Sequence, residues 1–211
     1  MDNKRPAVFT TMLGQSTPWF TIACCALLVV CYFYPPIFDL FYFERSLVND
    51  GEVWRLLTSQ FVHLDNQHLL YNCGAMLVLG LIIEEEHRID AIVMLTIGLV
   101  VVGACLPFSQ LDRYAGLSGA INALVPPAIW LVWARSKSII PIAIALLYFG
   151  RLAWEFTQDT SLLSADLTWP SYTPAHLQGL AAGLGWMLIR AKPVLLAYRS
   201  QTTQEANNEA S

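Results

Sequence analysis

Charged residues are scarce in this sequence. Of its 211 residues only 13% are Asp, Glu, Lys or Arg, whereas 55% are hydrophobic. A soluble domain of this length normally has about a quarter of its residues charged. Charge is absent altogether from four runs, 19–38, 91–111, 114–134 and 167–189. Each run reaches the roughly 20 residues that cross a bilayer, so the composition excludes an ordinary soluble domain.

Two shorter apolar segments accompany these runs, 69–83 between His68 and Glu84 and 138–150 between Lys137 and Arg151. Long charged side chains can reach the interface from inside a bilayer and so extend a short span. The sequence therefore predicts an all-α, polytopic membrane protein with six transmembrane helices. We expect a cytoplasmic leader over residues 1–18, one membrane domain over 19–190 and a polar cytoplasmic tail over 191–211.

The distribution of positive charge predicts the orientation. If the N-terminus is cytoplasmic, eight Lys and Arg residues lie on the inner side and four on the outer side. The inner set is Lys4, Arg5, Arg88, Arg135, Lys137, Arg190, Lys192 and Arg199, and the outer set is Arg45, Arg55, Arg113 and Arg151. This excess favours cytoplasmic termini. The first apolar run is too long, and too late in the chain, for a typical cleaved signal peptide.

Cysteine and histidine patterns give little support for a metal or a disulfide framework. The five cysteines all lie in apolar runs and lack metal-ligand spacing, which is typical of small core residues. His63 and His68 are five residues apart, which places them poorly on one helical face, and no third ligand is evident. We therefore expect no metal and no cofactor.

A serine lies near the start of one apolar run, within "GLSG". Ser118 has Gly116 and Gly119 beside it, and glycine permits a tight entry into a helix. Backbone N–H groups are free at a helix N-terminus and suit a developing oxyanion. Serine and glycine are also common where transmembrane helices pack, so the motif alone leaves both interpretations open. It is not the G-x-S-x-G elbow of soluble hydrolases, because residue 120 is alanine.

A histidine in the last apolar run provides a partner for this serine. His176, Gly179 and Gly183 share one helical face, and the two glycines would let another helix pack closely beneath the histidine. In the predicted topology Ser118 and His176 lie at matching depth, roughly 5–10 Å inside the outer boundary. An imidazole at this position could take the hydroxyl proton and return it to a leaving group.

Further polar residues precede or lie within the other predicted helices. His68 and Asn72 share a face four residues apart and could donate hydrogen bonds to an oxyanion. Asp65 is a predicted N-cap for this helix. Arg151 and Glu155 are predicted to form a structural ion pair, with Glu155 facing the site as the alternative.

The remaining local patterns suggest ordinary structural roles. Residues 84–88, "EEEHR", are typical of a solvated turn between two helices. Pro35-Pro36 and Pro126-Pro127 predict a stop or a kink in their helices. Polar groups are expected to gather in the outer half of the membrane.

In combination these motifs resemble the rhomboid family of intramembrane serine proteases, over about residues 52–188. "VWRLLTSQFVHLDNQHLLYN" resembles the family's W-R segment followed by H-x4-H-x3-N. Gly80 and Glu84 match a glycine and a glutamate at the end of the second helix. "GLSG" resembles G-x-S-G, and "AHLQGLAAG" resembles A-H-x2-G-x3-G.

The resemblance implies a role for each matching residue. Ser118 would be the nucleophile and His176 the general base, with no third catalytic acid, which is a variant of triad logic. His68, Asn72 and the Ser118 N–H would form the oxyanion hole. His63, Trp54 and Arg55 match family positions with structural roles.

Two departures indicate a subgroup. Asn122 stands where many rhomboids have an aromatic residue, and residues 125–127, "VPP", replace a glycine-rich continuation. "YAGLSG", "RLAWE" and "AHLQGLAAG" resemble the bacterial rhombosortases. This resemblance implies a bacterial inner-membrane protease whose active site faces the periplasm. Its substrates would be exported proteins with a C-terminal Gly-Gly-type membrane tail, in the lipid bilayer and with no nucleic-acid partner.

Two alternatives remain at this point. The first is a catalytically inactive rhomboid-like protein that binds membrane clients, against which the presence of both Ser118 and His176 argues. The second is a small transporter, which would need a polar path across the whole membrane.

Overall fold

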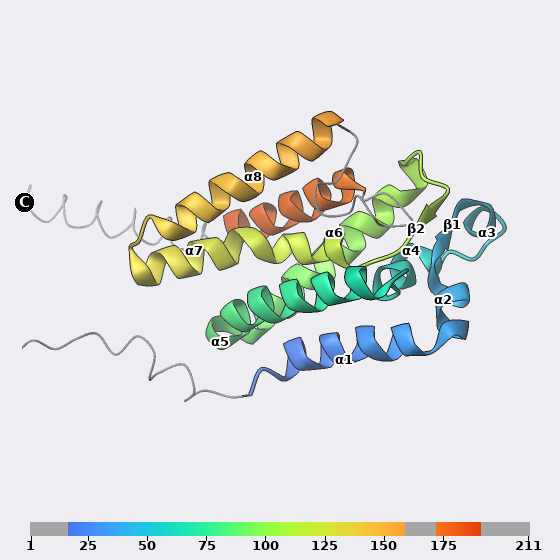
Figure 1. Cartoon of the computed structure of the whole chain (residues 1–211), viewed down its shortest axis with the longest axis horizontal. Coiled ribbons are helices and arrows are strands. Elements are labelled where there is room, and N and C mark those ends of the chain that lie inside the picture. The colour runs from blue at the N-terminus through green and yellow to red at the C-terminus, as the bar shows by residue number, and fades with distance from the viewer. Residues whose placement is uncertain (1–16, 159–171, 191–211) are drawn as a thin grey trace, which may run out of the picture.

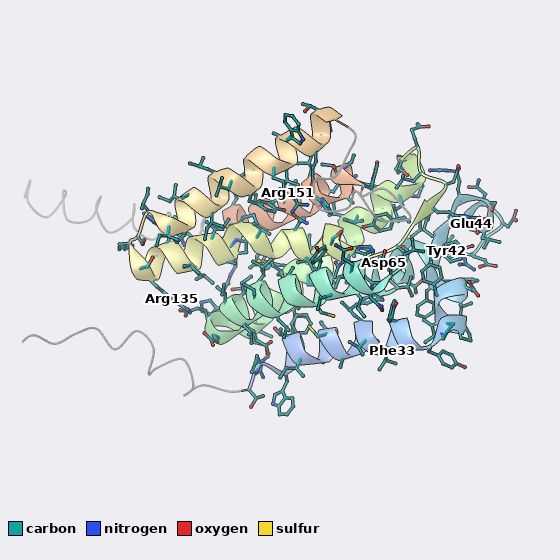
Figure 2. The ribbon with its side chains drawn as sticks, in the orientation of Figure 1. Phe33, Tyr42, Glu44, Asp65, Arg135 and Arg151 are labelled. Carbon is teal, nitrogen blue, oxygen red and sulfur yellow. The ribbon has the colours of Figure 1, made fainter. Side chains whose placement is uncertain are left out.

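The computed structural model describes residues 17–158 and 172–190. Its long helices lie side by side along the longest axis of the molecule, and its short elements gather at one end (Figure 1). Polar side chains lie at both ends, with Arg135 at one and Tyr42 and Glu44 at the other (Figure 2). The predicted all-α class is confirmed over the described residues, apart from two strands of two residues each.

The elements follow one another along the chain with short connections. The helical elements are α1 (Trp19–Phe33), α2 (Pro35–Phe41), α3 (Arg45–Asn49), α4 (Arg55–Thr58), η1 (Ser59–Phe61), α5 (Asn66–Cys105), η2 (Leu106–Phe108), α6 (Ser118–Ile121), η3 (Asn122–Leu124), α7 (Val125–Ser136), α8 (Ile140–Gln158) and a last helix over residues 173–190. Strand β1 (Phe43–Glu44) pairs antiparallel with β2 (Arg113–Tyr114).

The predicted first helix ends earlier than its apolar run suggests. Helix α1 stops at Phe33, and α2 continues from Pro35 at an angle of 100° to it. Proline lacks an N–H and disfavours helical geometry in the residue before it, here Tyr34. The expected kink is therefore confirmed. Helix α1 lies along the long axis of the bundle, and α2 turns away from it (Figure 1).

Helix α5 consists of two helices that fold back on each other at His87, whose backbone is not helical (φ −148°). A straight helix would place Leu99 about 50 Å from Asn66 at 1.5 Å per residue. Gln60 lies just before the start of α5, yet its Nε2 donates to the Leu99 carbonyl at 2.8 Å. The second half of α5 must therefore return towards the start of the first half. This confirms the predicted pair of helices with a turn at residues 84–88. The predicted N-cap is also confirmed, since the Asp65 Oδ1 accepts from the His68 N–H at 2.8 Å.

Glu84 corrects the prediction of a wholly solvated turn. Its side chain is buried and accepts hydrogen bonds from the Phe20 N–H at 3.0 Å and the Thr21 N–H at 2.8 Å. These N–H groups belong to the first turn of α1, where no intrahelical partner exists. The carboxylate therefore caps α1, and Arg88 Nε pairs with it at 2.9 Å. The sequence pattern misses this role because α1 is distant in the chain.

The largest of the three core clusters among the described residues lies between α1, α5, α6 and η3, and it includes Leu28, Met76, Ile83 and Leu124. Polar groups are less segregated than expected, because Asp90 is buried where α5 turns back and accepts from Trp186 Nε1 at 3.2 Å. Arg190 pairs with the same carboxylate at 3.2 Å.

By length and composition two of the described helices could cross a membrane, Asn66–Phe108 and Ile140–Thr157, or three if bent α1 and α2 count as one span. Because the first doubles back at His87, each of its halves is close to the roughly 20 residues that a span needs. Helix α8 also exposes large apolar side chains, including Ile144, Leu146 and Leu147. A contiguous apolar surface of this kind is typical of a lipid-facing helix.

Candidate active site

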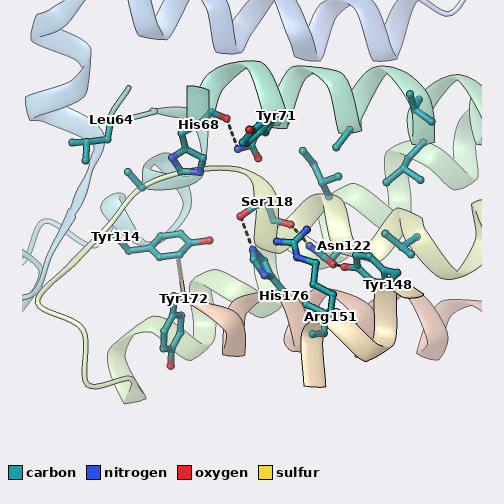
Figure 3. Close-up of a pocket in the computed structure, with 18 of the residues that line it drawn as sticks. Leu64, His68, Tyr71, Tyr114, Ser118, Asn122, Tyr148, Arg151, Tyr172 and His176 are labelled. Atoms are coloured by element: carbon teal, nitrogen blue, oxygen red, sulfur yellow. Dashed lines mark hydrogen bonds between the residues drawn. The ribbon is translucent and has the colours of Figure 1, made fainter. Parts of the chain in front are cut away.

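A cavity of about 720 Å³ opens at the end of the bundle where the short elements lie. Its walls come from α5, the 109–117 connection, α6, α8 and the last helix (Figure 3). The lining includes five of the predicted site residues, Ser118, His176, His68, Asn72 and Asn122. The structure therefore brings together groups that are more than 100 residues apart in the sequence.

Ser118 and His176 are in direct contact in this cavity. The His176 Nε2 and the Ser118 Oγ are 2.9 Å apart, which is a hydrogen-bonding distance (Figure 3). Ser118 is the first residue of α6, and His176 lies in the first turn of the last helix and is 8% exposed. A neutral imidazole at this distance can accept the hydroxyl proton.

Gly116 shapes the approach to this serine. Its φ of +112° is a conformation that L side chains rarely adopt. A Cβ at this position would overlap the imidazole of His68, so only glycine leaves room for that ring. The Gly116 N–H donates to the Ser59 carbonyl at 3.0 Å, which fixes the turn. Gly116 thus lets the His68 ring lie against the chain two residues before Ser118.

Asn72 lines the same cavity one helical turn after His68. Its side chain is buried, and Nδ2 donates to the His68 carbonyl at 2.8 Å. This bond uses one of the two amide hydrogens and leaves the other for a further acceptor. Its Oδ1 has no hydrogen-bond partner among the described residues.

Glycines bring the last helix against α6 and η3. A Cβ on Gly179 would overlap the carbonyl oxygen of Gly119, and one on Gly183 would overlap that of Ala123. Gly119 itself has the Tyr114 hydroxyl 3.0 Å from its ideal Cβ position. The close helix packing predicted beneath His176 is therefore present, and it brings the imidazole to Ser118.

His63 lies behind the cavity rather than in its lining. It is 2% exposed, and its ring meets the His68 ring edge to face with centroids 5.0 Å apart. Burial, followed by the effect of His68, lowers the pKa of His63 to about 3, so this imidazole is neutral at physiological pH. It supports the His68 ring as a neutral packing partner.

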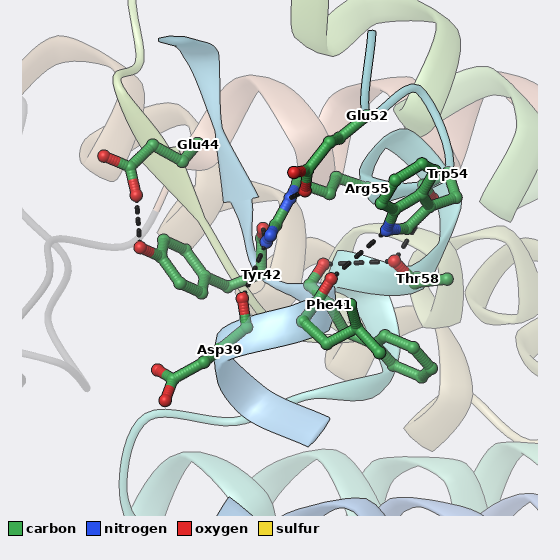
Figure 4. Close-up of polar contacts among 9 residues, drawn as sticks. Asp39, Phe41, Tyr42, Glu44, Glu52, Trp54, Arg55 and Thr58 are labelled. Atoms are coloured by element: carbon green, nitrogen blue, oxygen red, sulfur yellow. Dashed lines mark hydrogen bonds and ion pairs between the residues drawn. The ribbon is translucent and has the colours of Figure 1, made fainter. Parts of the chain in front are cut away.

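Trp54 and Arg55 lie outside the cavity, at the junction of α2 and α4 (Figure 4). Arg55 is buried, pairs with Glu52 at 2.6 Å and donates from Nη1 to the Tyr42 carbonyl at 2.8 Å. Trp54 Nε1 donates to the Leu40 carbonyl at 3.3 Å. Carbonyls at the end of a helix lack intrahelical donors. The Trp54 and Arg55 side chains supply donors to these carbonyls at the end of α2.

Asn122 braces the serine through the hydrogen bonds of its side-chain amide. Its Nδ2 donates to the Ser118 carbonyl at 2.6 Å, and its Oδ1 accepts from the Tyr148 hydroxyl. Tyr148 belongs to α8 and lines the cavity. Tyr148 did not emerge from the sequence, where it is one aromatic residue in an apolar run.

Tyr114 is a second residue of the site that the sequence did not reveal. It is 6% exposed, lines the cavity and pairs in β2 with Phe43. Burial raises the pKa of its hydroxyl, which therefore stays protonated. The sequence shows only that Tyr114 lies four residues before Ser118. This spacing alone does not indicate a role for the tyrosine in the site.

Arg151 and Glu155 form the predicted ion pair in α8, with Nε and Oε1 2.9 Å apart. Arg151 lines the cavity, while the Glu155 side chain lies fully buried behind it. Among the described residues, no group of three or more His, Cys, Asp or Glu side chains is arranged to hold a metal ion.

The fold defines a helical integral membrane protein with a serine–histidine contact in a cavity at one end of its bundle. Comparison with known sequences identifies the family. The rhomboid domain matches residues 50–193, and the chain belongs to the rhomboid family.

Individual relatives agree with this assignment. The chain is 31% identical to human rhomboid-related protein 3 over 82% of its own length and 49% of that protein. It is 26% identical to the rhomboid protease GlpG of Haemophilus influenzae, over 87% of its own length and 95% of that protein. A match to the rhomboid protease GluP of Bacillus subtilis is 30% identical over 51% of this chain and 23% of that protein. The chain thus spans about half the length of the human relative and nearly all of the Haemophilus one.

Proposed function

We propose that this protein is an intramembrane serine endopeptidase that uses Ser118 as nucleophile and His176 as general base. The observation that carries the proposal is the 2.9 Å contact between Ser118 Oγ and His176 Nε2 in a cavity among apolar helices. Ionisable groups within spanning segments are costly and usually functional. The named rhomboid proteases among the relatives give independent support.

The chemistry would run in two steps. Ser118 Oγ attacks the scissile carbonyl carbon as His176 Nε2 takes the hydroxyl proton, and His176 then gives this proton to the leaving amine. Water hydrolyses the resulting ester, with the same imidazole as base. His68, the second amide hydrogen of Asn72 and the Ser118 N–H would bind the oxyanion of each tetrahedral intermediate.

We propose six membrane spans, counting α1, the two halves of α5, the segment from α6 to α7, α8 and the last helix. The excess of Lys and Arg on one side supports cytoplasmic termini and, with Ser118 at the opposite end, an active site towards the periplasm of a bacterial inner membrane.

The proposed substrates are transmembrane segments with glycines near the cut, such as the C-terminal Gly-Gly-type tails of exported proteins. Glycine costs about 1 kcal/mol relative to alanine within a helix, so such a segment unwinds more readily into the cavity. The "YAGLSG" and "RLAWE" motifs and Asn122 support the rhombosortase subgroup.

Cleavage in proteoliposomes tests the proposal. The full chain is reconstituted with a single-span reporter that contains a Gly-Gly pair near its outer end, and mass spectrometry locates the new termini. We expect one cut near the Gly-Gly pair, and no product from Ser118→Ala although that variant still reconstitutes as a folded protein. Equal cleavage by Ser118→Ala would refute the dyad. Stable binding of the reporter without any product would instead favour an inactive client-binding protein, and solute flux without proteolysis a transporter.

A further inference from the structure

An ion pair lies at membrane depth in α8, a helix of which little else is buried. The candidate span that covers α8 has only 17% of its residues buried inside the protein. The Glu155 side chain is nevertheless fully buried, and the Arg151 side chain is 30% exposed. Charges are placed in this way at a cost, and a purely structural pair would not need to face a cavity.

Only part of the Arg151 guanidinium is occupied by this pair. Nε donates to Glu155 at 2.9 Å, whereas the two terminal nitrogens have no hydrogen-bond partner among the described residues. Figure 3 shows the guanidinium directed into the part of the cavity that holds Ser118 and His176. Glu155 therefore orients a planar fork whose terminal donors face the place where a substrate would react.

The charges around the cavity decide between two classes of acceptor. Asp65, Asp112 and Arg113 also line it, so together with Arg151 and Glu155 they leave a formal excess of one negative charge. A substrate carboxylate would increase this excess in a poorly solvated site. A neutral carbonyl oxygen would not. An unwound segment also exposes backbone carbonyls that lipid cannot satisfy, each costing several kcal/mol.

We propose that Arg151, oriented by Glu155, is a substrate-binding residue that donates to backbone carbonyls of the unwound segment beside the scissile bond. The inference rests on the proposed protease function and extends it. In this proposal α8 takes part in substrate binding. Its Arg151 would stabilise the extended backbone of any neutral segment and would not recognise a particular side chain.

The first test compares variants on one substrate, a neutral synthetic single-span peptide with a central Gly-Gly pair. Losing a charge-assisted hydrogen bond should lower kcat/KM about 10- to 100-fold in Arg151→Met. Arg151→Lys should fall between, since it keeps the charge but not the fork. Leu147→Ala, on the exposed side of α8, is the matched control and should cleave normally. Reaction of Ser118 with a small fluorophosphonate should persist in Arg151→Met, because this probe has no peptide carbonyls.

The second test locates the contact. Peptides with single amide-to-ester replacements outside the scissile bond carry one weakened carbonyl acceptor each. At one or two positions near the cut the ester should slow the wild-type protein several-fold and leave Arg151→Met unaffected, which is the coupling expected of a direct contact.

Several results would overturn the inference. Unchanged kcat/KM in Arg151→Met, a defect confined to peptides with an acidic residue near the cut, or the absence of ester coupling at every position would each do so. Joint loss of fluorophosphonate reaction and thermal stability in Arg151→Met and Glu155→Gln would show a structural ion pair instead. If the wild-type chain neither reacts nor cleaves, the proposed function fails as well, which distinguishes the two failures.

Discussion

Both ends of the Ser118 residue are held by neighbouring side chains. Its Oγ contacts His176 at 2.9 Å, and its carbonyl accepts from Asn122 at 2.6 Å. Because Asn122 also accepts from Tyr148, the backbone of the serine is tied to α8. The asparagine at position 122 was interpreted from the sequence as the mark of a subgroup. Its brace to α8 could not be predicted, since nothing in the pattern of α8 singles out Tyr148.

This brace gives a prediction at the scale of single residues. Asn122→Ala removes both side-chain hydrogen bonds, while the Ser118 carbonyl keeps the backbone N–H of residue 122 as a donor. The Tyr148 hydroxyl loses its acceptor, so we expect a loss of about 1–3 kcal/mol in the free energy of unfolding. Unfolding in mixed detergent micelles measures the change. Tyr148→Phe removes only the hydroxyl and should cost less, about 1 kcal/mol. Equal stability of Asn122→Ala and the wild-type protein would show that the brace contributes nothing.

At the scale of helices, the glycine contacts decide where the last helix lies. Gly179 and Gly183 approach carbonyl oxygens of α6 and η3 so closely that no Cβ fits. Gly185, in the same helix, has nothing within 4 Å of its ideal Cβ position. Replacing glycine by alanine at both positions therefore separates the effect of close helix packing from the effect of helix propensity on stability.

We expect Gly179→Ala to destabilise the fold by about 1–3 kcal/mol, because the added methyl group forces the helices apart. Gly185→Ala should instead be neutral or stabilising by up to about 1 kcal/mol, since alanine is the better helix former. Thermal unfolding in detergent compares the two variants. A similar effect of both substitutions would contradict the close contact between Gly179 and Gly119.

Helix boundaries and helix contacts differ in how far the sequence predicts them. The break before Pro35 and the Asp65 cap follow from local chemistry and were predictable. The capping of α1 by Glu84 was not, because it joins groups 63 and 64 residues apart. A charged triplet at a turn is typical of a solvated surface, and only the packing of α1 against α5 buries one of its members.

At the scale of the whole molecule, the bundle brings together the serine and the histidine from helices that are 58 residues apart in the chain. Matching depths could be predicted from helix length and charge, and the glycine face predicted a close neighbour. Matching depth made Ser118 and His176 candidate partners, and the resemblance to a family then implied their roles as nucleophile and general base.

The central claim is that His176 activates Ser118 as a nucleophile. The most direct measurement is peptide mapping by mass spectrometry after the reconstituted full chain reacts with a fluorophosphonate. We predict a single adduct on Ser118, absent from Ser118→Ala and formed at least about 100-fold more slowly in His176→Ala, the scale of general-base catalysis. An adduct on another residue, or equal labelling of Ser118 without His176, would contradict the account.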